Sequence, residues 1–206
     1  MDVTTEVYLD LDDTALDTAA FKQFLADSLV PHGVSTEAFF TAYRKVRAAG
    51  SFSIAKLVAG LPVELDKREL VAATLAQCAA ECERFLYPDV LPFLETARQR
   101  RVRVVLYTYG DEGVQMLKLS GLQALTSQVD RVEITADSDK PLPPLAPKMR
   151  RIVIDDRLEV LKKYVGVAEV TPVLLARTNA ARQPSKLTAY PTLIAVAQIL
   201  TKEGLW

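Results

Sequence analysis

Three carboxylates directly follow the first apolar segment of the chain, at Asp10, Asp12 and Asp13. Residues 7–9 have the β-branched and aromatic character of a short buried strand, so the strand is predicted to end where the acids begin. Carboxylates this close together repel one another and resist burial, which favours a site where a cation, a charged substrate or water compensates their charge. A polar turn after an edge strand also explains such a group when it is isolated. The rest of the chain therefore decides between these interpretations.

Polar residues also follow two later apolar segments. Residues 102–107 and 151–154 are rich in Val and Ile and are predicted to form buried strands. Carboxylate oxygens are the ligands that Mg²⁺ prefers, and a phosphate group needs donors such as a hydroxyl or an ammonium group. If the strands are neighbours, their ends would form one edge suited to a divalent cation and a phosphate. The polar residues after these strands, and one lysine in the proline-rich loop 137–144, are Thr108, Lys140, Asp155 and Asp156.

Strands and helices alternate after residue 87. This alternation predicts an α/β fold, in which helices cover both faces of a parallel sheet. Functional residues in such sheets lie at the carboxyl ends of the strands, so the polar residues described above are expected at one edge. The predicted strands cover residues 102–107, 129–134, 151–154 and 171–175, and the predicted helices cover residues 90–100, 112–119, 157–164 and 190–200.

The segment between residues 18 and 85 is predicted to be helical almost throughout. Its first helix is expected to end at Pro31-His32-Gly33, and Ser35 is a typical N-cap for the second. A short third helix is predicted over residues 51–59, closed by Gly60, and a fourth over residues 66–85.

The composition of the chain bears on its partners. Its 206 residues include 25 Lys plus Arg against 26 Asp plus Glu, so the balance does not favour nucleic acid or an anionic membrane as the main partner. No apolar run approaches the ~18 residues that span a bilayer, and the chain is expected to be cytoplasmic. Cys78 and Cys82 are predicted to be buried thiols on a helix, because a metal or redox role needs more ligands than the one histidine supplies. The oligomeric state is left open.

Taken in chain order, the motifs resemble the four signature motifs of the haloacid dehalogenase (HAD) superfamily. Residues 18–85 lie where members with an insertion-type helical cap carry that cap, so the resemblance covers most of the chain. It implies a Rossmann-like core made of residues 1–17 and 86–206, with a small all-helical cap of residues 18–85 inserted after the first strand. The matching segments are Asp10-Leu11-Asp12-Asp13-Thr14, Tyr107-Thr108-Tyr109-Gly110, Asp139-Lys140-Pro141 and Ile154-Asp155-Asp156.

The resemblance implies separate roles for the acids after the first strand. Asp10 would attack the substrate phosphorus and form an aspartyl-phosphate, since an ionised carboxylate is already a nucleophile. Asp12 would protonate the leaving oxygen and then activate the hydrolytic water. Asp13 stands where many members have glycine, and it is expected to bond within the turn.

The donors of the site are implied in the same way. Thr108 would donate a hydrogen bond to a phosphoryl oxygen, assisted by the backbone N–H groups of Tyr109 and Gly110. Lys140 would hold the nucleophile and the phosphoryl group together by its charge. Lys148 is an alternative to Lys140, because prolines occupy the segment between Lys140 and Asp155 where many relatives place a helix.

The resemblance also implies a Mg²⁺ cofactor. Asp10 and Asp156 would bind the metal directly, and Asp155 would act through a water molecule or through the residues around the metal. The backbone carbonyl of Asp12 would complete the protein's share of the ligands.

The function that follows is that of a Mg²⁺-dependent phosphatase acting on a small phosphorylated metabolite. A phosphomutase and another HAD-type hydrolase, such as a dehalogenase, are alternatives, and phosphonate-cleaving relatives use a cap lysine, for which Lys22, Lys45 and Lys56 are the candidates. A catalytically weak binding or regulatory module is an alternative of a different class, suggested by the short segment before Asp155. Tyr43, Arg44, Arg47 and Lys56 are candidate specificity residues, although a solvated helix face also explains each of them.

Overall fold

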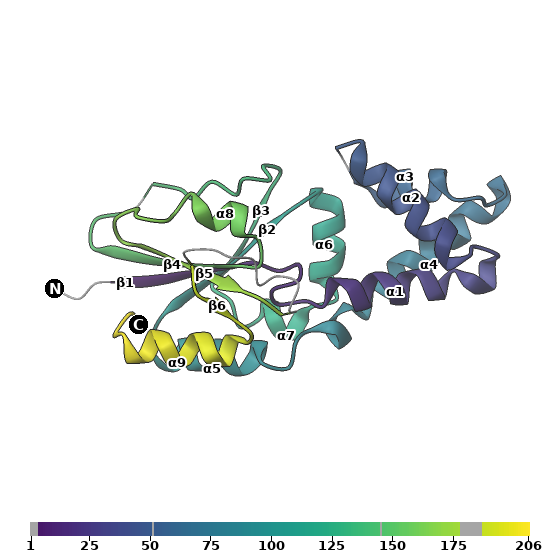
Figure 1. The fold of residues 1–206 in the computed structure, drawn as a ribbon. Coiled ribbons are helices and arrows are strands. Elements are labelled where there is room, and N and C mark those ends of the chain that lie inside the picture. Colours follow the sequence, from purple (N-terminus) through teal and green to yellow (C-terminus); the bar gives the residue numbers. More distant parts are fainter. Residues whose placement is uncertain (1–3, 51, 145, 178–186) are drawn as a thin grey trace.

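A parallel sheet forms the centre of the protein (Figure 1). The computed structural model describes residues 4–50, 52–144, 146–177 and 187–206. In these residues the sheet has six strands in the order β3-β2-β1-β4-β5-β6, and every neighbouring pair is parallel. The predicted α/β fold is therefore confirmed. The strands are β1 (Thr4–Leu9), β2 (Arg103–Tyr109), β3 (Arg131–Thr135), β4 (Met149–Asp155), β5 (Val170–Leu175) and β6 (Ala189–Tyr190).

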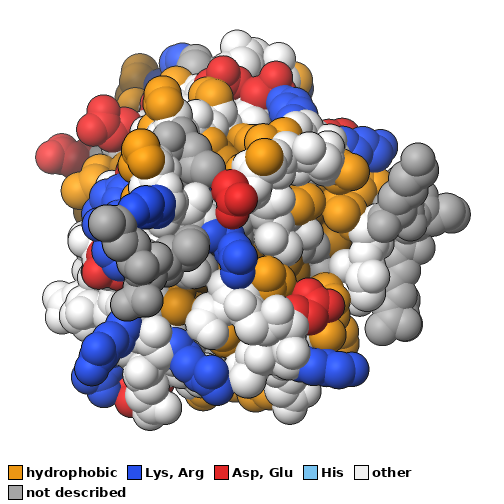
Figure 2. All heavy atoms as spheres, turned by 90° about the vertical axis from the view of Figure 1, so that its left-hand side faces the viewer, with side chains coloured by type: hydrophobic (Ala, Val, Ile, Leu, Met, Phe, Trp, Pro, Cys, Tyr) orange, Lys and Arg blue, Asp and Glu red, His pale blue; other side chains and the backbone are white. Residues whose placement is uncertain are grey.

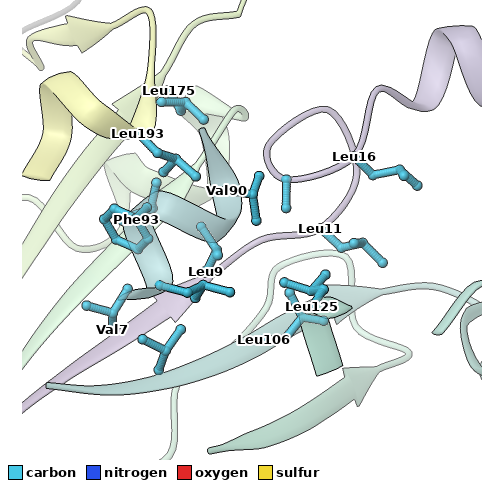
Figure 3. Packing of buried hydrophobic residues seen from close by; sticks show 14 of the residues in the cluster. Val7, Leu9, Leu11, Leu16, Val90, Phe93, Leu106, Leu125, Leu175 and Leu193 are labelled. Atoms are coloured by element: carbon cyan, nitrogen blue, oxygen red, sulfur yellow. The ribbon is translucent and has the colours of Figure 1, made fainter. Parts of the chain in front are cut away.

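Alternating residues of the central strands build two separate apolar layers, because successive side chains of a strand point to opposite faces. Val7 and Leu9 of β1 belong to the larger layer, which α5 (Val90–Gln99) and α9 (Leu193–Lys202) cover (Figure 3). Tyr8, between them, belongs to the smaller layer on the other face, which α8 (Leu158–Lys162) covers. Two further helices of this part of the chain are α6 (Glu112–Ser120) and α7 (Gln123–Thr126).

Residues 18–85 form a group of helices that we call the helical lobe. It extends from one end of the sheet (Figure 1) and has its own apolar core, in which Leu29, Phe39 and Leu75 are buried. The division of the chain into a cap and a core domain at residues 17 and 86 stays a prediction. The lobe contains α1 (Thr18–Ser28), α2 (Thr36–Ala48), α3 (Ile54–Gly60) and α4 (Arg68–Ala80), with 3₁₀ turns at Val30–His32, Leu65–Lys67 and Cys82–Phe85.

Side-chain caps fix where several of these helices begin. Asp17 and Ser35 accept hydrogen bonds from backbone N–H groups of the first turns of α1 and α2, as expected of N-caps. The third helix starts at Ile54, later than predicted, because Ser53 is its cap; Ser51 lies outside the described residues. The prediction for the fourth helix was also wrong at both ends, since it begins at Arg68 after a 3₁₀ turn and ends at Ala80.

Several boundaries of the strands and of the helices beside them differ from the predictions. β3 covers Arg131–Thr135 and not residues 129–134, and β4 covers Met149–Asp155 and not residues 151–154. β2 continues through Thr108 and Tyr109 instead of ending at residue 107, because both residues pair with β3. A short strand, β6, occupies Ala189–Tyr190, so the last helix starts at Leu193, after the cap Thr192. The helix predicted over residues 157–164 is limited to Leu158–Lys162.

Both cysteines are buried, as predicted, although only Cys78 lies in α4, and Cys82 begins the following 3₁₀ turn. Within the described residues, none of the helices has the length and apolar character that crossing a bilayer requires. On the face seen in Figure 2, basic and acidic side chains are interspersed among apolar and neutral ones.

Candidate active site

The polar ends of three adjacent strands lie side by side. β1 is the central strand of the three, with β2 on one side and β4 on the other, so the acids after β1 lie between Thr108 and the pair Asp155-Asp156. Asp10 continues the pairing, since its backbone N–H donates to the carbonyl of Ile154 at 3.0 Å. This register brings Asp10 beside the end of β4, as the sequence predicts.

Lys140 forms two buried ion pairs that connect the end of β1 to the end of β4. Its Nζ lies 2.6 Å from Oδ1 of Asp10 and 2.8 Å from Oδ2 of Asp155. Burial alone would lower the pKa of Lys140, but the two carboxylates outweigh it and raise the pKa above the usual lysine value. The ammonium group therefore stays charged between the two acids.

The loop that carries Lys140 is fixed by two tyrosines. The hydroxyl of Tyr164 donates to the carbonyl of Lys140 at 2.6 Å, and the hydroxyl of Tyr107 donates to the carbonyl of Pro141 at 2.7 Å. Lys148 precedes β4, and its carbonyl accepts from the N–H of Thr4 at the opposite end of the sheet. The geometry therefore places Lys140, and not Lys148, beside Asp10.

Asp10, Asp155 and Asp156 form an acidic cluster, in which one oxygen of each lies within 4.8 Å of the others. Burial raises the pKa of Asp10 to about 7 although Lys140 opposes the rise, and the nearby carboxylate of Asp155 adds to it. Burial together with the carboxylates of Asp10 and Asp155 raises the pKa of Asp156 to about 8. Hard oxygen ligands held this close are what a divalent cation such as Mg²⁺ requires. The residues present therefore fit the predicted metal.

The acids of the cluster differ in whether their carboxylate oxygens already accept hydrogen bonds from the protein. Both oxygens of Asp155 have donors, since Oδ2 faces Lys140 and Oδ1 accepts from the backbone N–H of Arg157 at 2.8 Å. Asp156 is less buried and faces the cavity described below. This difference agrees with a direct metal ligand at Asp156 and a more indirect role for Asp155.

The carboxylate of Asp12 lies in a separate group of donors. Nζ of Lys118 lies 2.8 Å from both of its oxygens, Nε2 of Gln115 lies 3.3 Å from one, and the Thr18 hydroxyl lies 3.0 Å from the other. Burial would raise the pKa of Asp12, but Lys118 and the hydrogen bonds outweigh it, so the pKa lies below the usual aspartate value. No carboxylate oxygen of Asp12 belongs to the acidic cluster among the described residues, so its predicted metal contact is confined to its backbone carbonyl.

Gln115 and Lys118 are the residues of this site that the sequence did not single out. They are three residues apart on α6 and so share one face of that helix, and both are buried. Gln115 also donates to the carbonyl of Tyr109 at 2.7 Å. The neighbouring Gly110 has φ +155°, and a Cβ there would lie 2.6 Å from Nε2 of Gln115, so glycine is needed for this contact.

Thr108 is fully buried, and among the described residues its hydroxyl has no hydrogen-bond partner. A buried hydroxyl group without a partner costs about 1–3 kcal/mol, which favours a role in binding a ligand atom. Asp13 has φ +62°, and its backbone N–H bonds to the carbonyl of Leu16 and to the Thr18 hydroxyl, which is the turn chemistry predicted for it.

A cavity of about 630 Å³ opens between the helical lobe and this edge of the sheet. Asp10, Asp12 and Asp156 line it from the sheet, together with Tyr109 and Gly110. Of the predicted specificity residues, Tyr43 and Arg47 line the cavity, whereas Arg44 and Lys56 do not belong to its lining. Lys22 also lines it, unlike the other two lysines considered for phosphonate cleavage.

The fold is similar to that of solved HAD-like hydrolases. A haloacid dehalogenase-like hydrolase from Burkholderia xenovorans LB400 matches with a TM-score of 0.71 at 17% identity, over 97% of each chain. A HAD-hydrolase from Bacillus subtilis, bound to magnesium, matches with a TM-score of 0.62 at 16% identity, over 97% of this chain and 99% of that one. A HAD phosphatase from Thermococcus onnurineus matches with a TM-score of 0.57 at 19% identity, over 97% of this chain and 98% of that one.

Other matched structures include a dehalogenase and a protein named as a β-phosphoglucomutase from Thermotoga maritima. No family model and no curated protein matches the sequence. At identities of 16–19% the likeness shows the fold of these proteins and not their activity. The chain therefore has the fold of HAD-like hydrolases.

Proposed function

We propose that the chain is an enzyme of the HAD superfamily, a Mg²⁺-dependent phosphatase that hydrolyses a small phosphorylated metabolite. The observation that carries the proposal is the pair of contacts from Lys140 to Asp10 and Asp155. Asp10 and the neighbouring Asp156 line the cavity. A cation site, a fixed ammonium group and an accessible carboxylate together are the parts that phosphoryl transfer to a carboxylate needs.

Asp10 is the nucleophile in this proposal. Its carboxylate oxygen attacks the phosphorus and forms an aspartyl-phosphate, while the bond to the leaving oxygen breaks and that oxygen takes a proton. Water then attacks the phosphorus of the aspartyl-phosphate, which releases inorganic phosphate and restores the carboxylate. Bound Mg²⁺ would be held by Asp10 and Asp156, and it would offset the repulsion between the carboxylate and the phosphoryl group.

Asp12 is the proton donor and acceptor for the two steps. Its side chain lines the cavity, so it can reach a leaving oxygen or a water molecule there. The contacts with Lys118, Gln115 and Thr18 hold the carboxylate in one place. Thr108 and the backbone of Tyr109 and Gly110 are proposed to bind the phosphoryl oxygens.

The position of Asp12 favours a phosphatase over a dehalogenase. A halide leaves without a proton, so a dehalogenase has no use for an acid at the position of Asp12. The presence of an acid at this position in the cavity lining therefore supports an oxygen leaving group. A phosphomutase uses the same chemistry, with a second hydroxyl group that accepts the phosphoryl group. It is the second candidate function.

The expected substrate is small, because the helical lobe covers the site and leaves a cavity typical in size of small-molecule pockets. We also propose that the protein acts in the cytoplasm without a nucleic-acid or membrane partner. The nearly balanced charge of the chain supports this part of the proposal.

The test is turnover of a generic aryl phosphate with Mg²⁺. We expect hydrolysis by the wild type, loss of activity on chelation of the metal, and a loss of at least about a thousandfold in Asp10→Asn, because an amide is not a nucleophile. Asp27→Asn is the matched control, since Asp27 is exposed on α1 and does not belong to the cavity lining, so this variant should retain activity. Circular dichroism checks that the variants are folded.

Three outcomes would contradict the proposal. A folded wild type without turnover of any phosphate ester would favour a binding or regulatory module. Turnover retained by Asp10→Asn would show that another residue is the nucleophile. Release of halide from a 2-haloacid, with no phosphate release from esters, would favour the dehalogenase alternative.

A further inference from the structure

The lobe side of the cavity has an aromatic wall. Phe39, Tyr43 and Phe52 line the cavity. Tyr43 packs against both of the other rings, with its centroid 6.2 Å from that of Phe39 and 5.0 Å from that of Phe52. Phe21 of α1 also lines the cavity. Flat apolar groups pack well on such a surface, because aromatic rings prefer stacked or edge-to-face contacts.

One lysine, Lys22, contacts this aromatic wall. Nζ of Lys22 lies 5.2 Å from the centroid of the Tyr43 ring, which is a cation–π contact, and Lys22 itself is half-buried. Among the described residues, Lys22 has no carboxylate partner within ion-pair distance. The Tyr43 ring attracts the ammonium group but does not neutralise it.

The other basic residues that line the cavity already pair with carboxylates or are exposed to solvent. Lys118 is bound to Asp12, and Arg157 faces Asp155 at 3.7 Å. Arg47 lines the cavity from the last turn of α2, but it is exposed to solvent. Among the described residues that line this cavity, Lys22 is therefore the half-buried cation that can form an ion pair with a ligand.

The two walls of the cavity thus offer different chemistry to one molecule. The sheet edge would take a phosphoryl group, and the lobe offers aromatic surface and a positive charge. We infer that the substrate is a phosphomonoester whose leaving group has a flat apolar or aromatic part and carries a second anionic group, which Lys22 binds. This inference rests on the proposed phosphatase function, since that function places the phosphoryl group at Asp10.

A matched pair of esters tests the inference. 3-(Carboxymethyl)phenyl phosphate and its neutral amide have nearly the same shape and differ in the second charge; the para isomers cover a different position of that charge. We expect kcat/KM of the wild type to favour the carboxylate by about tenfold, mainly through KM, because an ion pair at a half-buried site strengthens binding. Lys22→Met should abolish the preference for the carboxylate over the amide.

Lys45→Met is the matched control, because Lys45 is an exposed lysine of α2 that does not belong to the cavity lining. It should keep the full preference for the carboxylate. Equal kcat/KM for the charged and neutral esters in the wild type, in both isomers, would overturn the inference and leave the phosphatase function standing. A preference that survives Lys22→Met would overturn it as well.

Binding of the phenol products separates the inference from the function. The wild type and Lys22→Met are titrated with 3-hydroxyphenylacetate and with 3-hydroxyphenylacetamide, followed by nuclear magnetic resonance shifts. Tighter binding of the carboxylate that is lost in Lys22→Met supports the anion subsite even if no ester is hydrolysed, and in that case only the phosphatase proposal fails. Equal binding of both products by the wild type counts against the subsite.

Discussion

Asp10, which is buried, and Asp156, which is partly buried, are acids whose charges are not fully compensated by the protein. Their pKa values are raised to about 7 and about 8, so in the metal-free protein both hold protons at pH 6 that unfolded aspartates have lost. For acids with a raised folded pKa, the stabilising contribution is present at low pH and is lost as the pH rises through that pKa. The metal-free protein should therefore lose stability as the pH rises from about 4, where unfolded aspartates lose their protons, to about 8, where both folded acids have lost theirs.

Metal binding is expected to reverse this loss, because ligands must lose their protons before they bind a cation. We expect the apparent affinity for Mg²⁺ to rise by at least about tenfold between pH 6 and 8.5, with proton release at the lower pH. Isothermal titration calorimetry in two buffers of different ionisation enthalpy measures both quantities. Asp156→Asn should remove part of the pH dependence, whereas affinity independent of pH in the wild type would contradict this assignment of the cation site.

The sequence predicted the residues of the site that follow a strand or belong to a motif, and it missed those whose role depends on packing. Asp10, Asp155 and Asp156 could be predicted because the ends of adjacent parallel strands meet at one edge. Gln115 and Lys118 lie inside a predicted helix, and no local pattern indicates that this helix turns one face towards Asp12. Their positions follow from how α6 packs, which is a tertiary property.

At the scale of elements, helix α6 is fixed by close contact with the lobe. It carries Gln115 and Lys118 and ends at Ser120. Its C-cap Gly121 lies against the end of α4. A Cβ on Gly121 would lie 2.3 Å from the carbonyl oxygen of Ala79, closer than such atoms approach one another. Gly121 has φ −91°, so it is required for space and not for backbone conformation.

Gly121→Ala should therefore push α4 and α6 apart. We expect a loss of about 1–3 kcal/mol in the free energy of unfolding, the usual cost of overpacking, measured by urea denaturation. Gly113→Ala is the control, because its Cβ would first meet an oxygen of Asp111 at 3.4 Å and alanine is the better helix former. Equal stability of Gly121→Ala and the wild type would show that α4 and α6 adjust to the added methyl group freely.

The boundaries of the elements were predictable where a side chain marks them. Ser35 caps α2 as its sequence indicates, and Gly121 ends α6. The strand at Ala189–Tyr190 was missed, because two residues carry no alternation, and pairing with β5 alone defines it. The fourth helix of the lobe was predicted to start at Asp66, because aspartate is a common cap residue. Asp66 instead lies inside a 3₁₀ turn that precedes α4.

For the whole molecule, one buried ion pair connects segments from distant parts of the chain. Arg177 follows β5 and lies 2.7 Å from Oδ2 of Asp89, which also accepts from the N–H of Leu193 at the start of α9. The same guanidinium donates to the carbonyl of Thr14, in the turn after β1, and its Cζ lies 4.1 Å from the centroid of the Tyr87 ring. The turn that carries Asp12 is thus tied to the two helices on one face of the sheet.

Removing this arginine should destabilise the molecule more than removing an exposed one. Arg177→Met leaves the buried carboxylate of Asp89 unpaired, for which we expect a loss of about 3–5 kcal/mol in the free energy of unfolding, measured by urea denaturation. Arg98→Met is the control, because Arg98 pairs with Glu95 on the exposed surface of α5 and should lose less than about 1 kcal/mol.

The double variant Asp89→Asn/Arg177→Met separates the two contributions to this loss. Asparagine can still accept from the N–H of Leu193 but carries no charge, so the double variant should be more stable than Arg177→Met if the unpaired charge is the main cost. A double variant as unstable as the single one would instead assign the loss to the hydrogen bonds with Thr14. In that case the turn after β1 should loosen, and the activity that depends on Asp12 should fall together with the stability.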